Sequence, residues 1–177
     1  MLSTRINSGA QKGKILVLPP QTVTRAVTAK VRASIFNKLD VDGVRVLDLY
    51  AGGGTLGFEA LSCGASSVTF VDRADKSIEV LKKNAQSLGL TAKASIKKSD
   101  VLKYCHNLGL KYDIVFLDPP YRQFNNTLVK TASNLVQLGG ILVVSCSSKS
   151  VLSPSDALEL IDEKTYGDTK IAYLKKV

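Results

Sequence analysis

The stretch VRVLDLYAGGGTLGFEA, residues 44–60, decides the fold that the sequence predicts. Its opening residues form a continuous apolar run, which predicts a buried strand over 44–50. The glycines at 52–54 close that strand, and residues 55–61 predict a short helix that ends at Gly64. A buried strand, a glycine turn and a helix in this order are typical of a parallel α/β sheet.

The same alternation of strand and helix continues to the end of the chain. Further strands are predicted at 67–72, 94–100, 114–118, 141–146, 160–165 and 170–176. Helices are predicted at 78–88, from 101 to about 108, at 128–138 and at 156–160. We therefore expect residues 41–177 to form one mostly parallel, seven-stranded α/β sheet, doubly wound with helices on both faces.

Residues 1–40 are predicted to form a small basic extension. A hairpin is expected over 1–20, with its turn at 10–13, and a helix over 28–39. Residues 1–39 carry seven lysines and arginines and no acid, in a chain with 24 basic and 15 acidic residues. A stretch of one sign favours a polyanionic partner, nucleic acid before membrane, although charge also serves solubility.

Composition argues against several protein classes. Apolar runs fall short of the roughly 20 residues that a membrane helix needs, and the N-terminus lacks the apolar core of a secretory signal. The three cysteines form no CxxC pair, so with a single histidine they predict free thiols and no metal site. We therefore expect a cytoplasmic protein without a membrane or metal partner, and take it to be a monomer.

The glycine loop predicts a nucleoside site. Gly52-x-Gly54-x-x-Gly57 lies between a strand and a helix, where bare backbone and free N–H groups bind ligands. Asp72 ends the next strand, where a carboxylate can accept hydrogen bonds from ribose hydroxyls. A dinucleotide is the competing ligand, but an anion at Asp48 would repel its pyrophosphate. The ammonium and sulfonium of S-adenosylmethionine suit Asp48 better, although Asp48 could instead cap the backbone of the turn.

Asp100 follows the third predicted strand of the sheet, and two roles stay open for it. Its carboxylate can accept a hydrogen bond from an adenine amino group, or it can cap the helix that follows. One residue could do both. The residues expected to bind the cofactor are Asp48, Tyr50, Ala51, Gly52, Gly54, Asp72, Arg73, Asp100 and Val101.

The segment DPPY, residues 118–121, follows the fourth strand and predicts a site that holds an amine. In this interpretation Asp118 and the Pro119 carbonyl accept the two N–H groups of a purine amine, which directs the lone pair at an electrophilic methyl. Pro119 and Pro120 stiffen the turn, and Tyr121 stacks on the base. The alternative is a strand-ending turn whose Tyr121 packs on the core. The catalytic interpretation is favoured because the same sheet carries a cofactor loop.

Four segments together resemble the RsmD family of bacterial 16S ribosomal RNA guanine-N2 methyltransferases. They are TRINSGAQKGKILVLPP (4–20), TRAVTAKVRASIFNKL (24–39), VLDLYAGGGTLGFEALSCGA (46–65) and YDIVFLDPPY (112–121). The glycine loop and DPPY are shared by many methyltransferases. The N-terminal arm and the pairs Val31-Arg32 and Phe36-Asn37 single out this family.

The resemblance implies a Rossmann-like class I methyltransferase that uses S-adenosylmethionine to methylate guanine N2 in 16S rRNA of the small ribosomal subunit, of the guanine-966 type. It also implies RNA contacts by Arg5, Lys12, Lys14, Arg25, Thr28 and Arg32. The chain departs from the family pattern at Arg25–Ala29, which lacks the usual proline and one acid, and at Ala33, which stands in place of a second acid. The alternatives are a DNA or RNA adenine-N6 methyltransferase and a non-catalytic RNA-binding factor in ribosome assembly.

Overall fold

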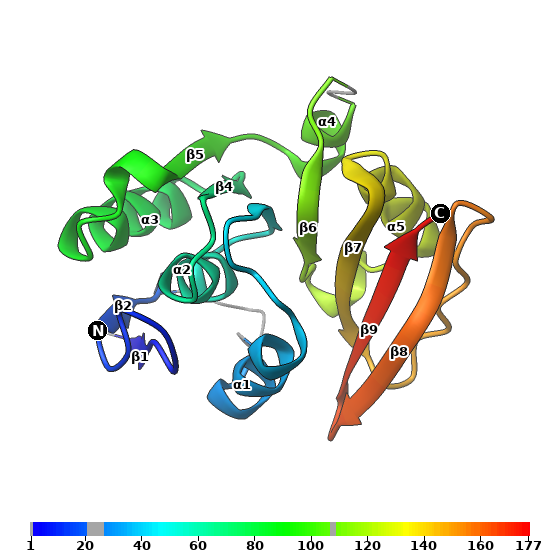
Figure 1. The fold of residues 1–177 in the computed structure, drawn as a ribbon, viewed down its shortest axis with the longest axis horizontal. Coiled ribbons are helices and arrows are strands. Elements are labelled where there is room, and N and C mark those ends of the chain that lie inside the picture. The colour runs from blue at the N-terminus through cyan, green and yellow to red at the C-terminus, as the bar shows by residue number, and fades with distance from the viewer. Residues whose placement is uncertain (1, 21–26, 107–108) are drawn as a thin grey trace.

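A seven-stranded sheet runs through the molecule, and a two-stranded hairpin lies at one side (Figure 1). The computed structural model describes residues 2–20, 27–106 and 109–177. The strands are β1 (Ser3–Arg5), β2 (Ile15–Val17), β3 (Arg45–Leu49), β4 (Ser67–Asp72), β5 (Ala94–Lys98), β6 (Tyr112–Leu117), β7 (Val136–Ser147), β8 (Leu158–Tyr166) and β9 (Thr169–Lys176). The helices are α1 (Ala29–Lys38), α2 (Thr55–Ser62), α3 (Asp75–Ser87), α4 (Val101–Cys105) and α5 (Asn126–Ser133), with 3-10 turns at Thr91–Lys93 and Tyr121–Gln123.

The order of strands in the sheet is β5-β4-β3-β6-β7-β9-β8. The strands from β5 to β7 pair in parallel, and β9 and β8 add to one edge as antiparallel strands. Helices α1, α2 and α3 pack on one face and α4 and α5 on the other, and each face buries its own apolar cluster. The predicted fold class is confirmed. The strand order reverses between β3 and β6, where sheets of this kind bind ligands at the carboxyl ends of the strands.

Two predicted helices differ from the structure in the C-terminal half. The helix predicted over 128–138 is shorter, because β7 takes its last residues. Residues 156–160 are not helical, since β8 begins at Leu158 and pairs with β9 along its length. Ladder hydrogen bonds to β9 override the helix preference of the local sequence. The predicted end of the helix near residue 108 lies outside the described residues.

The N-terminal hairpin shares the core of the sheet. Ile6 and Leu16 are buried in the same apolar cluster as α2 and β4. Glu59 of α2 is fully buried, and its carboxylate accepts hydrogen bonds from the backbone N–H groups of Asn7 (2.9 Å) and Ser8 (2.8 Å). A carboxylate from α2 therefore holds the loop that follows β1.

A second tie runs through Asn84 on α3, whose side chain is also buried. Its Oδ1 accepts a hydrogen bond from the Val17 N–H (3.0 Å), and its Nδ2 donates to the carbonyls of Val17 (3.0 Å) and Gly53 (2.9 Å). A Cβ on Gly53 would lie 2.7 Å from Leu18 Cδ2, so the glycine loop and the hairpin are in close contact. These contacts cross the domain boundary expected near residue 40, which stays a prediction.

In the described ranges no helix combines the length and the apolar composition needed to cross a bilayer. The same part of the chain brings no three His, Cys, Asp or Glu side chains together as a metal site. The cysteines are free thiols, of which Cys105 and Cys146 are buried and Cys63 is half-buried.

Candidate functional site

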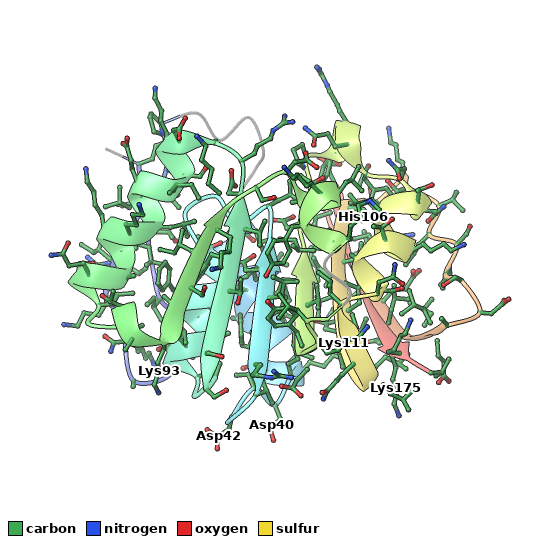
Figure 2. All side chains as sticks on the ribbon, turned by 90° about the horizontal axis from the view of Figure 1, so that it is seen from above. Asp40, Asp42, Lys93, His106, Lys111 and Lys175 are labelled. Carbon is green, nitrogen blue, oxygen red and sulfur yellow. The ribbon has the colours of Figure 1, made fainter. Side chains whose placement is uncertain are left out.

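Two cavities lie at the carboxyl edge of the sheet, and both are lined by the segment that follows β6. Asp118 and Pro120 line the smaller cavity, of about 350 Å³, together with the loops after β3 and β4. Tyr121 lines the larger cavity, of about 650 Å³, together with the start of α1 and the turn between β8 and β9. Asp42 and Lys93, which are labelled in Figure 2, lie at the opposite edge of the sheet from the two cavities. The parallel strands begin at that edge.

The loop after β3 has an unusual backbone. Tyr50, Gly52 and Gly54 have φ angles of 60°, 54° and 78°, in the left-handed region that favours glycine. A tyrosine in this left-handed region carries backbone strain of about 1 kcal/mol. Such strain is typical of functional loops. Gly57 has a different purpose: a Cβ there would lie 2.3 Å from Phe70 Cε1. The third glycine of the motif therefore lets α2 pack closely on β4.

Asp72 connects the glycine loop to the smaller cavity, which it lines. Its Oδ2 accepts a hydrogen bond from the Gly52 N–H (2.9 Å), and its Oδ1 accepts one from the Ala74 N–H (2.9 Å). Each carboxylate oxygen can accept a second hydrogen bond. Asp72 is thus fixed by backbone donors and can still receive the hydroxyls of a ribose.

Asp48 lies behind the loop. Its side chain is 2% exposed, and its Oδ2 accepts a hydrogen bond from the Gly57 N–H (3.0 Å) in the first turn of α2. Burial raises the pKa of Asp48 well above its usual value, and the negative charges of Asp118 and Asp72 raise it further. The backbone-capping role left open by the sequence is therefore observed, while the contact of Asp48 with the cofactor stays a prediction.

Asp100 has the capping role expected for it as one alternative, and its contact with an adenine stays a prediction. It caps α4, since its Oδ1 accepts a hydrogen bond from the Lys103 N–H (3.2 Å), and it lines the smaller cavity. Of the residues expected to bind the cofactor, those that line this cavity are Tyr50, Gly52, Asp72, Arg73, Asp100 and Val101. Those that lie buried behind its wall are Asp48, Ala51 and Gly54.

Asp118 follows the end of β6 and reaches the wall of the smaller cavity. Burial raises the pKa of Asp118 to about 6, and the Ser145 side chain opposes this rise. Ser145 is itself buried, on the neighbouring strand β7, and lines the larger cavity. The carboxyl group is therefore an acceptor at neutral pH that titrates close to it.

Tyr121 lies at the surface. Its side chain is 40% exposed, and its hydroxyl is 2.6 Å from Thr169 Oγ1 at the start of β9. This geometry excludes the alternative in which Tyr121 packs on the core. Pro119 is buried and Pro120 lines the smaller cavity, so the two prolines carry the chain from one cavity wall to the other.

The expected RNA contacts are spread over different parts of the molecule. Arg5, Lys12 and Lys14 lie exposed on the N-terminal hairpin. Thr28 caps α1 and lines the larger cavity. Arg25 lies outside the described residues.

The prediction that Arg32 contacts RNA at the surface is wrong, because its side chain is only 2% exposed. Its Nη atoms donate to the carbonyls of Val27 (2.9 Å) and Arg5 (2.9 Å) and to Thr4 Oγ1 (3.1 Å). Its Nε lies 3.7 Å from Glu59 Oε2, and both side chains are buried. The guanidinium thus joins α1 to the hairpin in the interior and is not available to RNA.

Sequence reasoning missed three parts of the site: Pro19 in the smaller cavity, and Ser145 and the turn 166–169 in the larger one. The hydroxyl within the apolar run ILVVSC was a signal for Ser145. Pro19 and the turn 166–169 reach the site through packing between distant parts of the chain, which no local sequence motif predicts.

The chain is similar to known proteins over most of its length. The family described as "Conserved hypothetical protein 95" matches residues 4–175. The chain is 36% identical over 182 residues to "Putative rRNA methyltransferase YlbH" of Bacillus subtilis, covering 97% of this chain and 98% of that protein. It is 32% identical over 140 residues to "Ribosomal RNA small subunit methyltransferase D" of Escherichia coli, covering 78% and 69%. The solved structure "Putative methyltransferase yhhF" of Escherichia coli has a TM-score of 0.89 and 25% identity, covering 98% of each chain.

Proposed function

Because the chain belongs to the family described as conserved hypothetical protein 95, that of the RsmD-type rRNA methyltransferases, we propose that it methylates the exocyclic N2 of a guanine in 16S rRNA. S-Adenosylmethionine is the methyl donor. The observation that carries the proposal is the position of Asp118, a half-buried carboxyl acceptor in the wall of a cavity that Asp72 and Asp100 also line.

The residues of the smaller cavity suit an adenosine with a cationic tail. Asp72 keeps free acceptor positions for ribose hydroxyls, and Asp100 can accept from an adenine amino group while it caps α4. Gly52 offers bare backbone at the wall. When bound, the cofactor supplies an electrophilic methyl group on its sulfonium.

Asp118 and the Pro119 carbonyl would accept the two N–H groups of the guanine amine. The lone pair of the nitrogen then points toward the methyl group, and proximity and orientation supply most of the acceleration. After transfer the nitrogen must lose one proton, and the ionised Asp118 is a suitable base for it. Tyr121, exposed beside this segment, offers a ring on which the base can stack.

The basic hairpin would hold the RNA outside the site. Arg5, Lys12 and Lys14 are exposed, and the net charge of the chain is +9, so contacts with phosphates release counterions. The expected contribution of Arg32 is not part of the proposal, since its guanidinium is buried.

The test is a transfer assay with labelled S-adenosylmethionine. Small subunits that lack the modification, naked 16S RNA and DNA serve in turn as acceptors, and the labelled base is mapped. We expect label on guanine N2, at position 966 if the full resemblance holds. Asp118→Ala should lose at least about 100-fold in rate, the usual contribution of a positioned acid or base.

The matched control is Asp40→Ala, at the opposite edge of the sheet (Figure 2), which should transfer as the wild type does. Label on an adenine would instead identify an N6 enzyme. The absence of transfer to every acceptor would leave an RNA-binding assembly factor and contradict the proposal.

A further inference from the structure

The larger cavity has two walls outside the cofactor loop and the DPPY segment. We propose that Lys30 of α1 and Lys164 of β8 face each other there as a phosphate clamp, which holds the RNA backbone on either side of the target nucleotide. This inference rests on the proposed function and adds the C-terminal strand pair to the RNA site. The hairpin at the N-terminus is then not the sole RNA contact.

The cavity has the size and position of an acceptor site. Its volume of about 650 Å³ lies within the range of about 300–1,000 Å³ that is usual for small-ligand pockets. Tyr121 and Ser145 line it, and Tyr121 lies three residues after Asp118. Asp118 itself lines the smaller cavity, so the DPPY segment borders both cavities. A nucleotide in the larger cavity would therefore bring its base to Asp118.

The charges of the wall favour a phosphodiester. Lys30 and Lys164 are exposed, and within the described residues neither has a carboxylate oxygen within 4.0 Å of its Nζ. Asp168 is the acid among the described lining residues, and it leaves an excess of one positive charge. Its carboxylate is a hydrogen-bond acceptor, which suits a base N–H better than a phosphate.

The wall is held in place relative to Asp118. Tyr121 contacts Thr169 across the cavity, and Ser34 of α1 hydrogen-bonds the Tyr166 hydroxyl. Lys164 Nζ lies 5.4 Å from the centre of the Tyr166 ring, an attractive cation–π arrangement. The strand pair, α1 and the DPPY segment thus form one connected frame around the cavity.

A single extruded nucleotide is the occupant that this frame suits. An enzyme that modifies an exocyclic group must take the base out of its stack. Two cations from opposite walls can then bind the phosphates before and after the extruded base. We therefore expect the clamp to act on single-stranded or extruded RNA, and to leave a continuous duplex unrecognised.

The experiment measures the affinity of a short guanine-containing single-stranded RNA by fluorescence anisotropy over a series of salt concentrations. Lys30→Ala and Lys164→Ala should each lower the slope of log affinity against log salt by about 0.7, the value for one phosphate on a single strand. At 0.1 M salt this corresponds to a loss of about fivefold in affinity. Lys30→Arg and Lys164→Arg should restore most of it.

Lys175→Ala is the control, since Lys175 is exposed at the opposite edge of the sheet (Figure 2). The affinity for S-adenosylhomocysteine, measured by calorimetry, should be the same in all variants. If wild-type enzyme methylates RNA while both alanine variants bind it with an unchanged slope, the clamp is wrong and the proposed function stands. If the clamp variants lose RNA affinity but the wild type transfers no methyl group, the proposed function is wrong and the clamp stands.

Discussion

At the scale of single residues, the environment of Asp118 sets the chemistry. A carboxyl group with a pKa of about 6 is mostly ionised at pH 7 and loses its charge just below. Burial is the main cause, and the Ser145 hydroxyl works against it. Because these two effects oppose each other, the Ser145 side chain favours the ionised form of Asp118.

We predict that kcat/KM rises with pH through a midpoint near 6, because the ionised form of Asp118 accepts the amine. Ser145→Ala removes the hydroxyl that lowers the pKa of Asp118, so its midpoint should move to higher pH. Rates measured between pH 5 and 8.5 check this. Ser147→Ala, two positions further on β7, should keep the wild-type midpoint. Equal midpoints for Ser145→Ala and wild type would contradict the role of Ser145.

The acids of the site were predictable because each follows its own strand in the sequence. Asp72, Asp100 and Asp118 stand where a parallel sheet gathers its carboxyl ends, so periodicity and topology suffice to place them. Ser145 and the turn 166–169 were not predictable in this way. They reach the site through pairing between strands far apart in the chain, which a local pattern does not encode.

At the scale of elements, a buried ion pair joins α1, α2 and the hairpin. The basic motif around Arg32 resembled a surface for RNA, but the sequence does not reveal that Glu59 lies opposite it. A run of basic residues shows the sign of the charge but does not show which of the side chains are buried. The apolar spacing of α1 could show which face is buried, and Arg32 lies beside Val31 on that face.

We predict that Arg32→Met costs about 3–5 kcal/mol of unfolding free energy, because Glu59 is left as a buried charge without its cation. Chemical denaturation measures the difference. Lys30→Ala, an exposed position on the same helix, should change stability by less than about 0.5 kcal/mol. Similar losses for the two variants would show that the buried pair has no special weight.

At the scale of the whole molecule, the N-terminal extension contributes to the smaller cavity and also carries exposed basic residues. Lys12 and Lys14 are exposed on the hairpin, while Pro19, just after β2, lines the smaller cavity. Asn84 fixes the hairpin to the glycine loop at Val17 and Gly53. The extension is therefore part of the wall of the smaller cavity, the proposed cofactor site, as well as the proposed RNA contact.

We predict that Asn84→Ala weakens S-adenosylhomocysteine binding about tenfold, equivalent to about 1.4 kcal/mol, because a buried hydrogen bond to Gly53 is lost. Calorimetry measures this. The double variant Lys12→Ala with Lys14→Ala should keep the cofactor affinity and lower only the affinity for RNA, since both lysines are exposed. Unchanged cofactor binding in Asn84→Ala would separate the hairpin from the cavity.

The Asn84 contacts have a consequence for the order of events. If only molecules with a docked hairpin bind the cofactor well, the observed dissociation constant equals the intrinsic one divided by the docked fraction. RNA that binds the hairpin would change the docked fraction and with it the affinity for the cofactor. Thermodynamic reciprocity then requires the cofactor to change the affinity for RNA by the same factor. Through the three hydrogen bonds of Asn84, binding of the cofactor and binding of the RNA would then each change the affinity for the other before any methyl group is transferred.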